Sequence, residues 1–467
     1  MNMGPGQRGS VAVVLGAGFS RAVYGLCPLT DDLGEAVRSR LGPADRAKLP
    51  PGRFADGRFE EWLSYLSESQ PHFTPEESAD ANALALRVTR LISEVLSQVQ
   101  ADALVAGTGE WFWQFLSVLH VLRAGAITLN YDNFVECGVH TLGLQSSGWG
   151  GSTLVCEDDI LAGLPPCADF SGISAQSAIE RTESGDPIRN AERRDGTFKL
   201  LKLHGSLSWY WLPDGGGGST LRRWRLPGIF GQLWDGEEEQ RHQELPAHEV
   251  FVVPPASLKG QRLREPVTRE LWRSAAYALK TAERLVLMGY SVPFADHSII
   301  GMLSEGLRGR EVQIEVVDPS ADVVAERLVR LGASANQIRQ TSGDDCIVEW
   351  TTAEVKRLAA EAVKALRNDS KLTDQVVLIF ADGQRVDRFR RLEPPNDPSE
   401  PLILHVNPEN LPLTKPVMYS DLQPLLGSVR ECAVEVDGHV LPVIDHWVRE
   451  EKSGALMTQL HLVPAGR

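Results

Sequence analysis

The stretch VAVVLGAGFS at residues 11–20 decides the fold, because five apolar residues in a row end in a glycine-rich turn. A short apolar run of this kind predicts a buried strand, and the glycines predict a tight turn at its carboxyl end. Such a turn lets the backbone come close to a pyrophosphate, whose charge suits the amides that follow. The candidate dinucleotide-binding residues at this turn are Gly16, Ala17, Gly18 and Ser20.

The glycine turn alone leaves two interpretations open. The next glycine is Gly25, so the spacing does not complete the G-x-G-x-x-G fingerprint of ordinary dehydrogenases. One interpretation is a phosphate-binding turn, and the other is a strand-to-helix turn without a ligand. We expect the next helix after Pro28, where a helical pattern begins.

Two further apolar runs end in polar residues and predict neighbouring strands of the same sheet. Ala126–Leu129 is followed by Asn130, and Phe198–Leu203 is followed by His204. The carboxyl ends of parallel strands meet at one edge, where open α/β sheets bind ligands. An amide there can orient a water or a ribose hydroxyl, and an imidazole with an unperturbed pKa near 6.5 can transfer a proton. We therefore interpret Asn130 and His204 as catalytic residues.

The remaining candidate binding residues follow the ends of predicted strands. Tyr131 and Asp132 come directly after Asn130, and Asp132 suits either a ribose hydroxyl or the cap of the next helix. Strands predicted at Arg284–Met288 and Val312–Val317 end in small or polar residues that suit a phosphate or a ribose diol, or else only a turn and a cap. The candidates there are Gly289, Ser291 and Asp318, and Asp296 is expected to cap a helix beginning near Ser298.

Alternation of strands and helices over residues 1–367 predicts an α/β fold: a Rossmann-like, doubly wound, mainly parallel sheet with helical insertions. Helices predicted at Phe59–Leu66, Ala81–Val99 and Trp111–Leu122 form one insertion, at about residues 55–123. From 368 to 467, short apolar runs separated by proline-rich turns predict a small β-rich C-terminal domain of unknown role.

Composition excludes several classes of protein. The chain has 467 residues and a net charge of −15, which disfavours a large phosphate-binding surface. Without a run of about 18 apolar residues or an apolar signal core, we expect no membrane span and a cytoplasmic location. The six cysteines contain no C-x₂₋₄-C pair, so no zinc ribbon is expected. Arg222–Arg225, which includes Trp224, forms either a local basic patch or a solvated loop.

Six segments occur in a specific order between residues 10 and 365: GAGFS, FEEWLSYL, TLNYDN, KLHGS, MGYSVPFAD and VVDPS. Together they resemble the sirtuin-like family, and within it the NAD-consuming branch found in bacterial antiphage defence. The resemblance implies a Rossmann-like core that cleaves NAD⁺ at the nicotinamide–ribose bond, with the family's asparagine and histidine at Asn130 and His204. Leu29-Thr30-Asp31 departs from the deacetylase pattern, and the zinc cysteines are missing, so peptide deacetylation is disfavoured.

The sequence therefore predicts an NAD⁺ glycohydrolase that forms nicotinamide and ADP-ribose, needs no metal, and acts as an antiphage effector of the abortive-infection type. The alternatives are a non-catalytic sensor subunit that binds NAD or ADP-ribose and, less favoured, an NAD-dependent protein deacylase. Unrestrained NAD⁺ cleavage would be toxic. We therefore expect control by homo-oligomerisation or by a partner such as an ATPase, a nuclease or a phage-derived activator.

Overall fold

Six parallel strands form the central sheet of the computed structural model. They are β1 (Val11–Leu15), β2 (Gly125–Thr128), β4 (Lys199–Lys202), β10 (Arg284–Met288), β11 (Gln313–Val317) and β12 (Ile338–Thr341). Their order is β12-β11-β10-β1-β2-β4, and every neighbouring pair is parallel. This is the doubly wound order 3-2-1-4-5-6, whose switch point lies between the first and fourth strands. The predicted Rossmann-like α/β fold is confirmed, and the switch point lies between β1 and β10.

The structure describes ten ranges of the chain and a set of short C-terminal strands. The ranges are 10–49, 59–67, 70–122, 124–146, 173–174, 198–213, 219–245, 248–253, 266–294 and 296–368, and after them only short strands between residues 376 and 461 are described.

Helices cover both faces of the sheet, as the complete burial of the five β1 residues requires. On one side α12 (Pro266–Thr281) packs against α13 (His297–Leu307) and contacts β1, β2 and β4. Elsewhere α6 (Glu110–Leu122) packs against α15 (Cys346–Asn368), which contacts β11, β12 and α1 (Ala17–Val23). Helix α14 (Ala321–Arg330) joins β11 to β12. The helix expected after Pro28 is confirmed as α2 (Thr30–Arg40), and a further helix, α1, begins directly at the glycine turn, where none was predicted.

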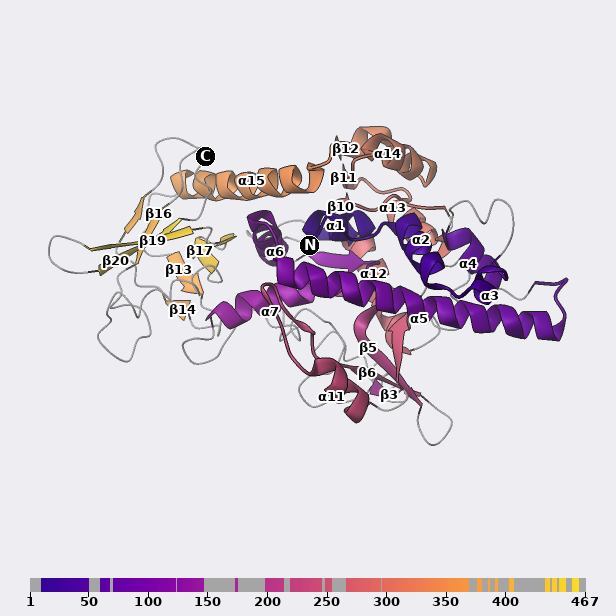
Figure 1. Cartoon of the computed structure of the whole chain (residues 1–467). Coiled ribbons are helices and arrows are strands. Elements are labelled where there is room, and N and C mark those ends of the chain that lie inside the picture. The colour runs from indigo at the N-terminus through magenta and orange to yellow at the C-terminus, as the bar shows by residue number, and fades with distance from the viewer. Residues whose placement is uncertain are drawn as a thin grey trace.

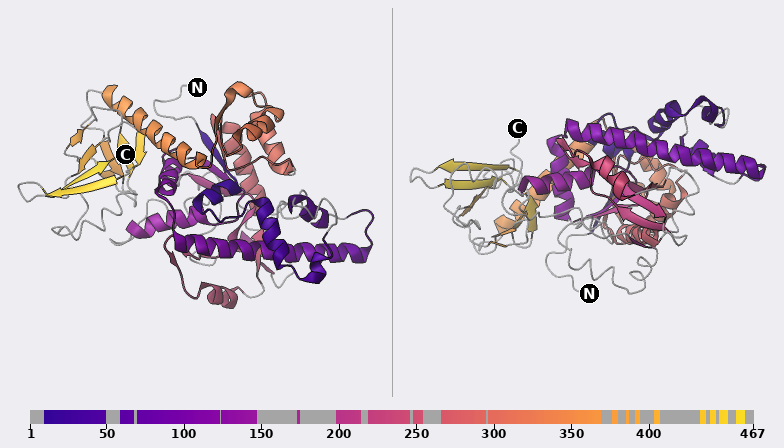
Figure 2. Two further views of the ribbon diagram at one scale, coloured as in Figure 1. Left: turned by 45° about the horizontal axis from the view of Figure 1, so that its top comes forward. Right: turned by 60° about the horizontal axis from the view of Figure 1, so that its bottom comes forward.

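A helical insertion lies between β1 and β2, as predicted. It contains α2 (Thr30–Arg40), α3 (Pro43–Arg46), α4 (Phe59–Ser67) and α5 (Pro75–Ala106), followed by α6. Helix α5 is longer than predicted because Thr74 and Glu77 form a capping box at its start and Gly107 ends it with a positive φ. Figures 1 and 2 show α5 running along one side of the molecule.

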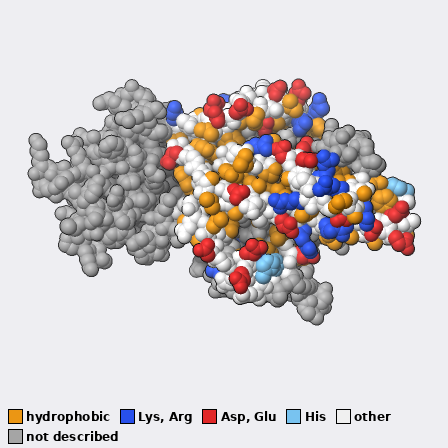
Figure 3. Space-filling view, in the orientation of Figure 1, with side chains coloured by type: hydrophobic (Ala, Val, Ile, Leu, Met, Phe, Trp, Pro, Cys, Tyr) orange, Lys and Arg blue, Asp and Glu red, His pale blue; other side chains and the backbone are white. Residues whose placement is uncertain are grey.

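Basic side chains gather over α2, α3 and α5 in the space-filling view, interleaved with acidic ones (Figure 3). Several form ion pairs: Arg38 with Glu35, Lys48 with Asp80, and Arg87 with Asp45. Because exposed pairs of this kind compensate each other's charge, this face has little excess charge to attract an anionic partner.

A second, antiparallel sheet follows β4 and was not predicted as a unit. Its strands, in spatial order, are β3 (Ile173–Ser174), β6 (Ser219–Arg223), β5 (Gly205–Pro213) and β9 (Glu249–Val252). Arg223 and Trp224 are buried at the end of β6, so neither a basic patch nor a solvated loop describes them. The small strands β7 (Gly228–Ile229) and β8 (Gln232–Leu233) and helix α11 (Glu237–Glu244) follow.

Helix α7 (Phe134–Ser146) completes the part of the chain around the site. Two four-stranded antiparallel sheets follow α15, ordered β14-β13-β17-β18 and β15-β16-β20-β19. Their strands are β13 (Val376–Ile379), β14 (Arg385–Val386), β15 (Arg391–Glu393), β16 (Ile403–Val406), β17 (Ala433–Val436), β18 (His439–Pro442), β19 (Asp445–Glu450) and β20 (Leu456–His461). The rest of 369–467 lies outside the described residues, so a separate C-terminal domain stays a prediction.

Candidate functional site

The glycine turn after β1 packs directly on the turn after β10, at the switch point of the sheet. Gly16 N donates to Met288 O at 3.1 Å, and Gly18 N donates to Gly289 O at 2.9 Å. Gly289 has φ +58°, and a Cβ at this position would lie 2.3 Å from Phe19 N. Only glycine allows this contact without strain. Since the Gly16 and Gly18 amides already have partners, a diphosphate bound at this turn would need other donors.

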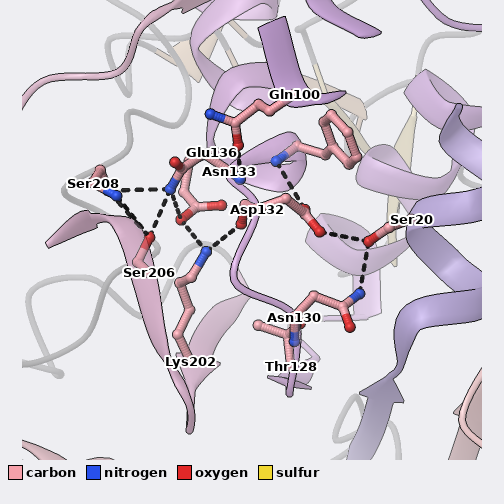
Figure 4. Close-up of polar contacts among 11 residues, drawn as sticks. Ser20, Gln100, Thr128, Asn130, Asp132, Asn133, Glu136, Lys202, Ser206 and Ser208 are labelled. Atoms are coloured by element: carbon pink, nitrogen blue, oxygen red, sulfur yellow. Dashed lines mark hydrogen bonds and ion pairs between the residues drawn. The ribbon is translucent and has the colours of Figure 1, made fainter. Parts of the chain in front are cut away.

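Asn130 is tied to this turn through its side-chain amide (Figure 4). Its Nδ2 donates to Gly16 O and to Ser20 Oγ, each at 2.8 Å. Ser20 Oγ in turn donates to Asp132 Oδ2 at 2.6 Å. Both amide hydrogens of Asn130 are therefore engaged, and its Oδ1 is the atom that would accept a bond from a water or a ribose hydroxyl.

Asp132 joins the strand end to helix α7. Its Oδ1 accepts from Phe134 N at 3.3 Å, as the capping interpretation predicted. Burial raises the pKa of the Asp132 carboxyl, although the charge of Lys202 and the bond from Ser20 act in the opposite direction. Asp132 therefore links Ser20 in α1 to the first residue of α7.

A buried ion pair supports the strand end from below. Lys202 Nζ lies 2.8 Å from Glu136 Oε1, and the two side chains are only 1% and 2% exposed. The same ammonium donates to the backbone carbonyl of Asp132. The Lys202 ammonium thus connects the end of β4 with the start of α7 and with the Asn130–Asp132 segment.

Asn133 extends this network in three directions. Its backbone N donates to Gln100 Oε1 of α5 at 2.6 Å. Its Nδ2 lies within hydrogen-bond distance of Glu136 Oε1 (3.1 Å), Ser206 Oγ (2.7 Å) and Ser208 Oγ (3.1 Å). None of these contacts was predicted from the sequence. The signals were a lysine inside an apolar strand and a second amide directly after Asp132.

His204 lies between β4 and β5, where the chain leaves the parallel sheet. The next residue, Gly205, has φ +83°, and a Cβ there would lie 2.1 Å from Phe251 O. His204 is 5% exposed, and its Nε2 lies 3.6 Å from Asp296 Oδ2. The Tyr131 ring is 6.3 Å away, between centroids. The structure therefore brings His204 next to the Asn130 segment.

Asp296 has two roles in the structure, one of which was predicted. Its side chain caps α13 by accepting from Ile299 N at 3.5 Å, as expected. It also faces His204, and this contact was not predicted. A carboxylate beside an imidazole orients the ring and stabilises the imidazolium that forms when the ring takes a proton.

The other predicted binding residues are placed less directly at the site. Tyr131 is buried and its hydroxyl donates to Val253 O at 2.7 Å. Ser291 is exposed, and its carbonyl accepts from Arg327 Nη1 at 2.5 Å. Asp318 follows β11 at the same sheet edge, where burial raises the pKa of its carboxyl. Ala17 is the first residue of α1.

Among the described residues, no three His, Cys, Asp or Glu side chains are grouped as metal ligands would be. A reaction without metal stays a prediction. No helix in the described ranges is both long and apolar enough to cross a membrane.

Comparison with known proteins adds no identification: no family model matches the sequence, and no curated protein matches it. The resemblance to the sirtuin-like family therefore rests on the six segments alone.

Proposed function

We propose that this chain is an NAD⁺ glycohydrolase of the sirtuin-like type, which cleaves the nicotinamide–ribose bond and releases nicotinamide and ADP-ribose. The observation that carries the proposal is the buried His204 beside Asp296, next to the Asn130 segment at the carboxyl edge of the sheet. In doubly wound folds this edge and its switch point bind dinucleotides. A histidine paired with a carboxylate supplies the base that a hydrolysis needs.

The reaction requires one bond to break and one to form at the ribose C1′ atom. The bond to the nicotinamide nitrogen breaks, and its electron pair leaves with nicotinamide, which becomes neutral. A water oxygen then bonds to C1′, and His204 takes the proton that this water loses. Asp296, 3.6 Å from Nε2, stabilises the imidazolium that results. Asn130 Oδ1 holds the water or a ribose hydroxyl in line.

We propose further that this activity serves antiphage defence by depleting NAD⁺, and that it is held in check until needed. Continuous cleavage would remove a cofactor that the cell requires. Control would come from homo-oligomerisation or from a partner such as an ATPase, a nuclease or a phage-derived activator.

The alternative to the hydrolase is a sensor subunit that binds NAD or ADP-ribose without chemistry. The internal bonds of the Gly16 and Gly18 amides bear equally on both candidates, because NAD⁺ and ADP-ribose each carry a diphosphate.

The test is nicotinamide release from NAD⁺ by the full chain, over a range of protein concentrations. His204→Ala should lower the rate by roughly 10²–10⁴-fold, the usual contribution of a general base. Asp296→Asn should lower it less, because the imidazole remains. His242→Ala is the matched control, since the side chain of His242 is 60% exposed and lies on α11.

Each outcome separates the candidates. Release by the native chain alone supports the hydrolase, and a steep dependence on protein concentration indicates activation by assembly. Binding of NAD⁺ without release supports the sensor. Release only in the presence of an acyl-lysine peptide would indicate a deacylase. Full activity of His204→Ala would remove His204 from the mechanism.

A further inference from the structure

Tyr290, in the turn after β10, has a buried hydroxyl without a partner. The residue is 6% exposed, and within the described part of the chain its hydroxyl has no hydrogen bond. An unpaired buried hydroxyl is unfavourable, so most buried tyrosine hydroxyls have a partner. A bound ligand that supplies the missing acceptor would explain why the Tyr290 hydroxyl has none in the protein.

The position of Tyr290 places it at the switch point. A Cβ on Gly16 would lie 2.7 Å from Tyr290 Cα and 2.8 Å from Tyr290 Cβ, so the tyrosine lies against the glycine turn. Two residues later, Val292 is completely buried and has φ +54°. A β-branched residue rarely adopts this conformation, and strain of this kind concentrates at ligand sites. The surrounding fold therefore holds the backbone of Val292 in a conformation that a valine does not prefer.

Charge defines the surroundings of the hydroxyl. Burial, and then the negative charges of Asp296 and Glu60, raise the pKa of Tyr290 well above its ordinary value. Asp296 also lies 3.6 Å from His204, while Glu60 belongs to α4. The charges of both carboxylates thus act on the hydroxyl, and Asp296 also faces the imidazole. Carboxylates repel a diphosphate and attract a cation, so this part suits a neutral or cationic group that carries a hydrogen-bond acceptor.

We propose that Tyr290 donates a hydrogen bond to the carboxamide oxygen of the substrate's nicotinamide ring, and that Asp296 and Glu60 make this end of the site selective for the cationic ring. This inference rests on the proposed function. It makes Tyr290 a specificity-determining residue and predicts that NAD⁺ binds more tightly than NADH, whose ring is uncharged. It also orients the substrate, because the diphosphate must point away from Glu60.

The experiment uses the full chain carrying His204→Ala, so that NAD⁺ is not consumed, and measures binding by calorimetry. Adding Tyr290→Phe should weaken NAD⁺ binding by about tenfold, the usual effect of losing one hydrogen bond. Binding of ADP-ribose, which lacks the nicotinamide ring, should not change. Glu60→Gln should narrow the preference for NAD⁺ over NADH. Tyr277→Phe is the matched control, because Tyr277 is 70% exposed on α12.

Thermal melting without ligand provides the second readout. Since the hydroxyl of Tyr290 has no internal partner, Tyr290→Phe should leave the melting temperature unchanged or raise it. A clear fall would show that the hydroxyl serves the fold and would overturn the proposal. Equal weakening of NAD⁺ and ADP-ribose, or no weakening of either, would also overturn it while leaving the proposed hydrolase intact. If the parent chain binds neither ligand, both proposals are wrong.

Discussion

The buried pair of Lys202 and Glu136 gives the sharpest prediction about stability. Lys202→Met removes the ammonium but keeps a chain of similar length and leaves the Glu136 carboxylate, 2% exposed, without its cation. Breaking a buried pair in this way costs about 3–5 kcal/mol of the free energy of unfolding. The Asp132 carbonyl also loses a donor, which places the expected loss toward the upper part of that range.

The double variant Lys202→Met/Glu136→Gln separates the lost charge from the lost packing. It removes both charges and keeps an amide that can still meet Asn133, so it should recover about 2–3 kcal/mol relative to the single variant. Urea unfolding followed by circular dichroism measures all three proteins. Lys48→Met is the control, because its pair with Asp80 is exposed and its loss should leave stability close to that of the native chain. A loss below about 1 kcal/mol for Lys202→Met, or a double variant as unstable as the single one, would refute the reasoning.

Three further predictions concern the same sheet edge. Gly289→Ala should cost at least about 2 kcal/mol, because φ is +58° and the new Cβ would lie 2.3 Å from Phe19 N. Gly301→Ala, in α13 with nothing within 4 Å of the new Cβ, should instead gain about 0.5–1 kcal/mol; urea unfolding compares the two. Burial raises the pKa of Asp132 from 3.8, so between its unfolded and folded pKa values the folded chain binds more protons and stability falls as pH rises. Asp132→Asn should flatten that fall in unfolding measured from pH 4 upward, and an unchanged slope would contradict the assignment. Burial raises the pKa of Cys346 to about 11, so this thiol should resist alkylation at about pH 8 until the chain is unfolded, which peptide mass mapping can check.

Two strands of the sheet were predicted to the residue, and the predicted bounds of β2, β4 and β11 differ by one residue at one or both ends. Val11–Leu15 and Arg284–Met288 coincide with β1 and β10, because burial on both faces removes polar residues from such strands. Strand β12 was missed because IRQT at Ile338–Thr341 pairs with only one neighbour and exposes its polar side chains. Helix α7 was expected only as a helix of unstated length after Asp132, because its apolar residues are not confined to one face.

Only the residues of the candidate site that directly follow a predicted strand could be identified from the sequence. Asn130 and His204 each follow an apolar run, so their common edge could be predicted. Asp296 lies far from His204 in the sequence, and only the turn after β10 brings the carboxylate to the imidazole. The KLHGS segment pointed to His204 and not to Lys202, because a lysine at the end of a strand ordinarily indicates solvent. Nor does a glycine motif reveal whether its amides face a ligand or a neighbouring turn.

The central position of β1 has a consequence for synthesis of the chain. Val11 pairs with Arg284, which the ribosome adds 273 residues later. At roughly 5–20 residues per second, about 14–55 s separate the two strands. During this interval one flank of the apolar VAVVL segment has no native neighbour, and an open strand edge of this composition readily joins other chains. We therefore expect the yield of folded protein to depend on translation speed and on holding chaperones more than on the stability of the finished sheet.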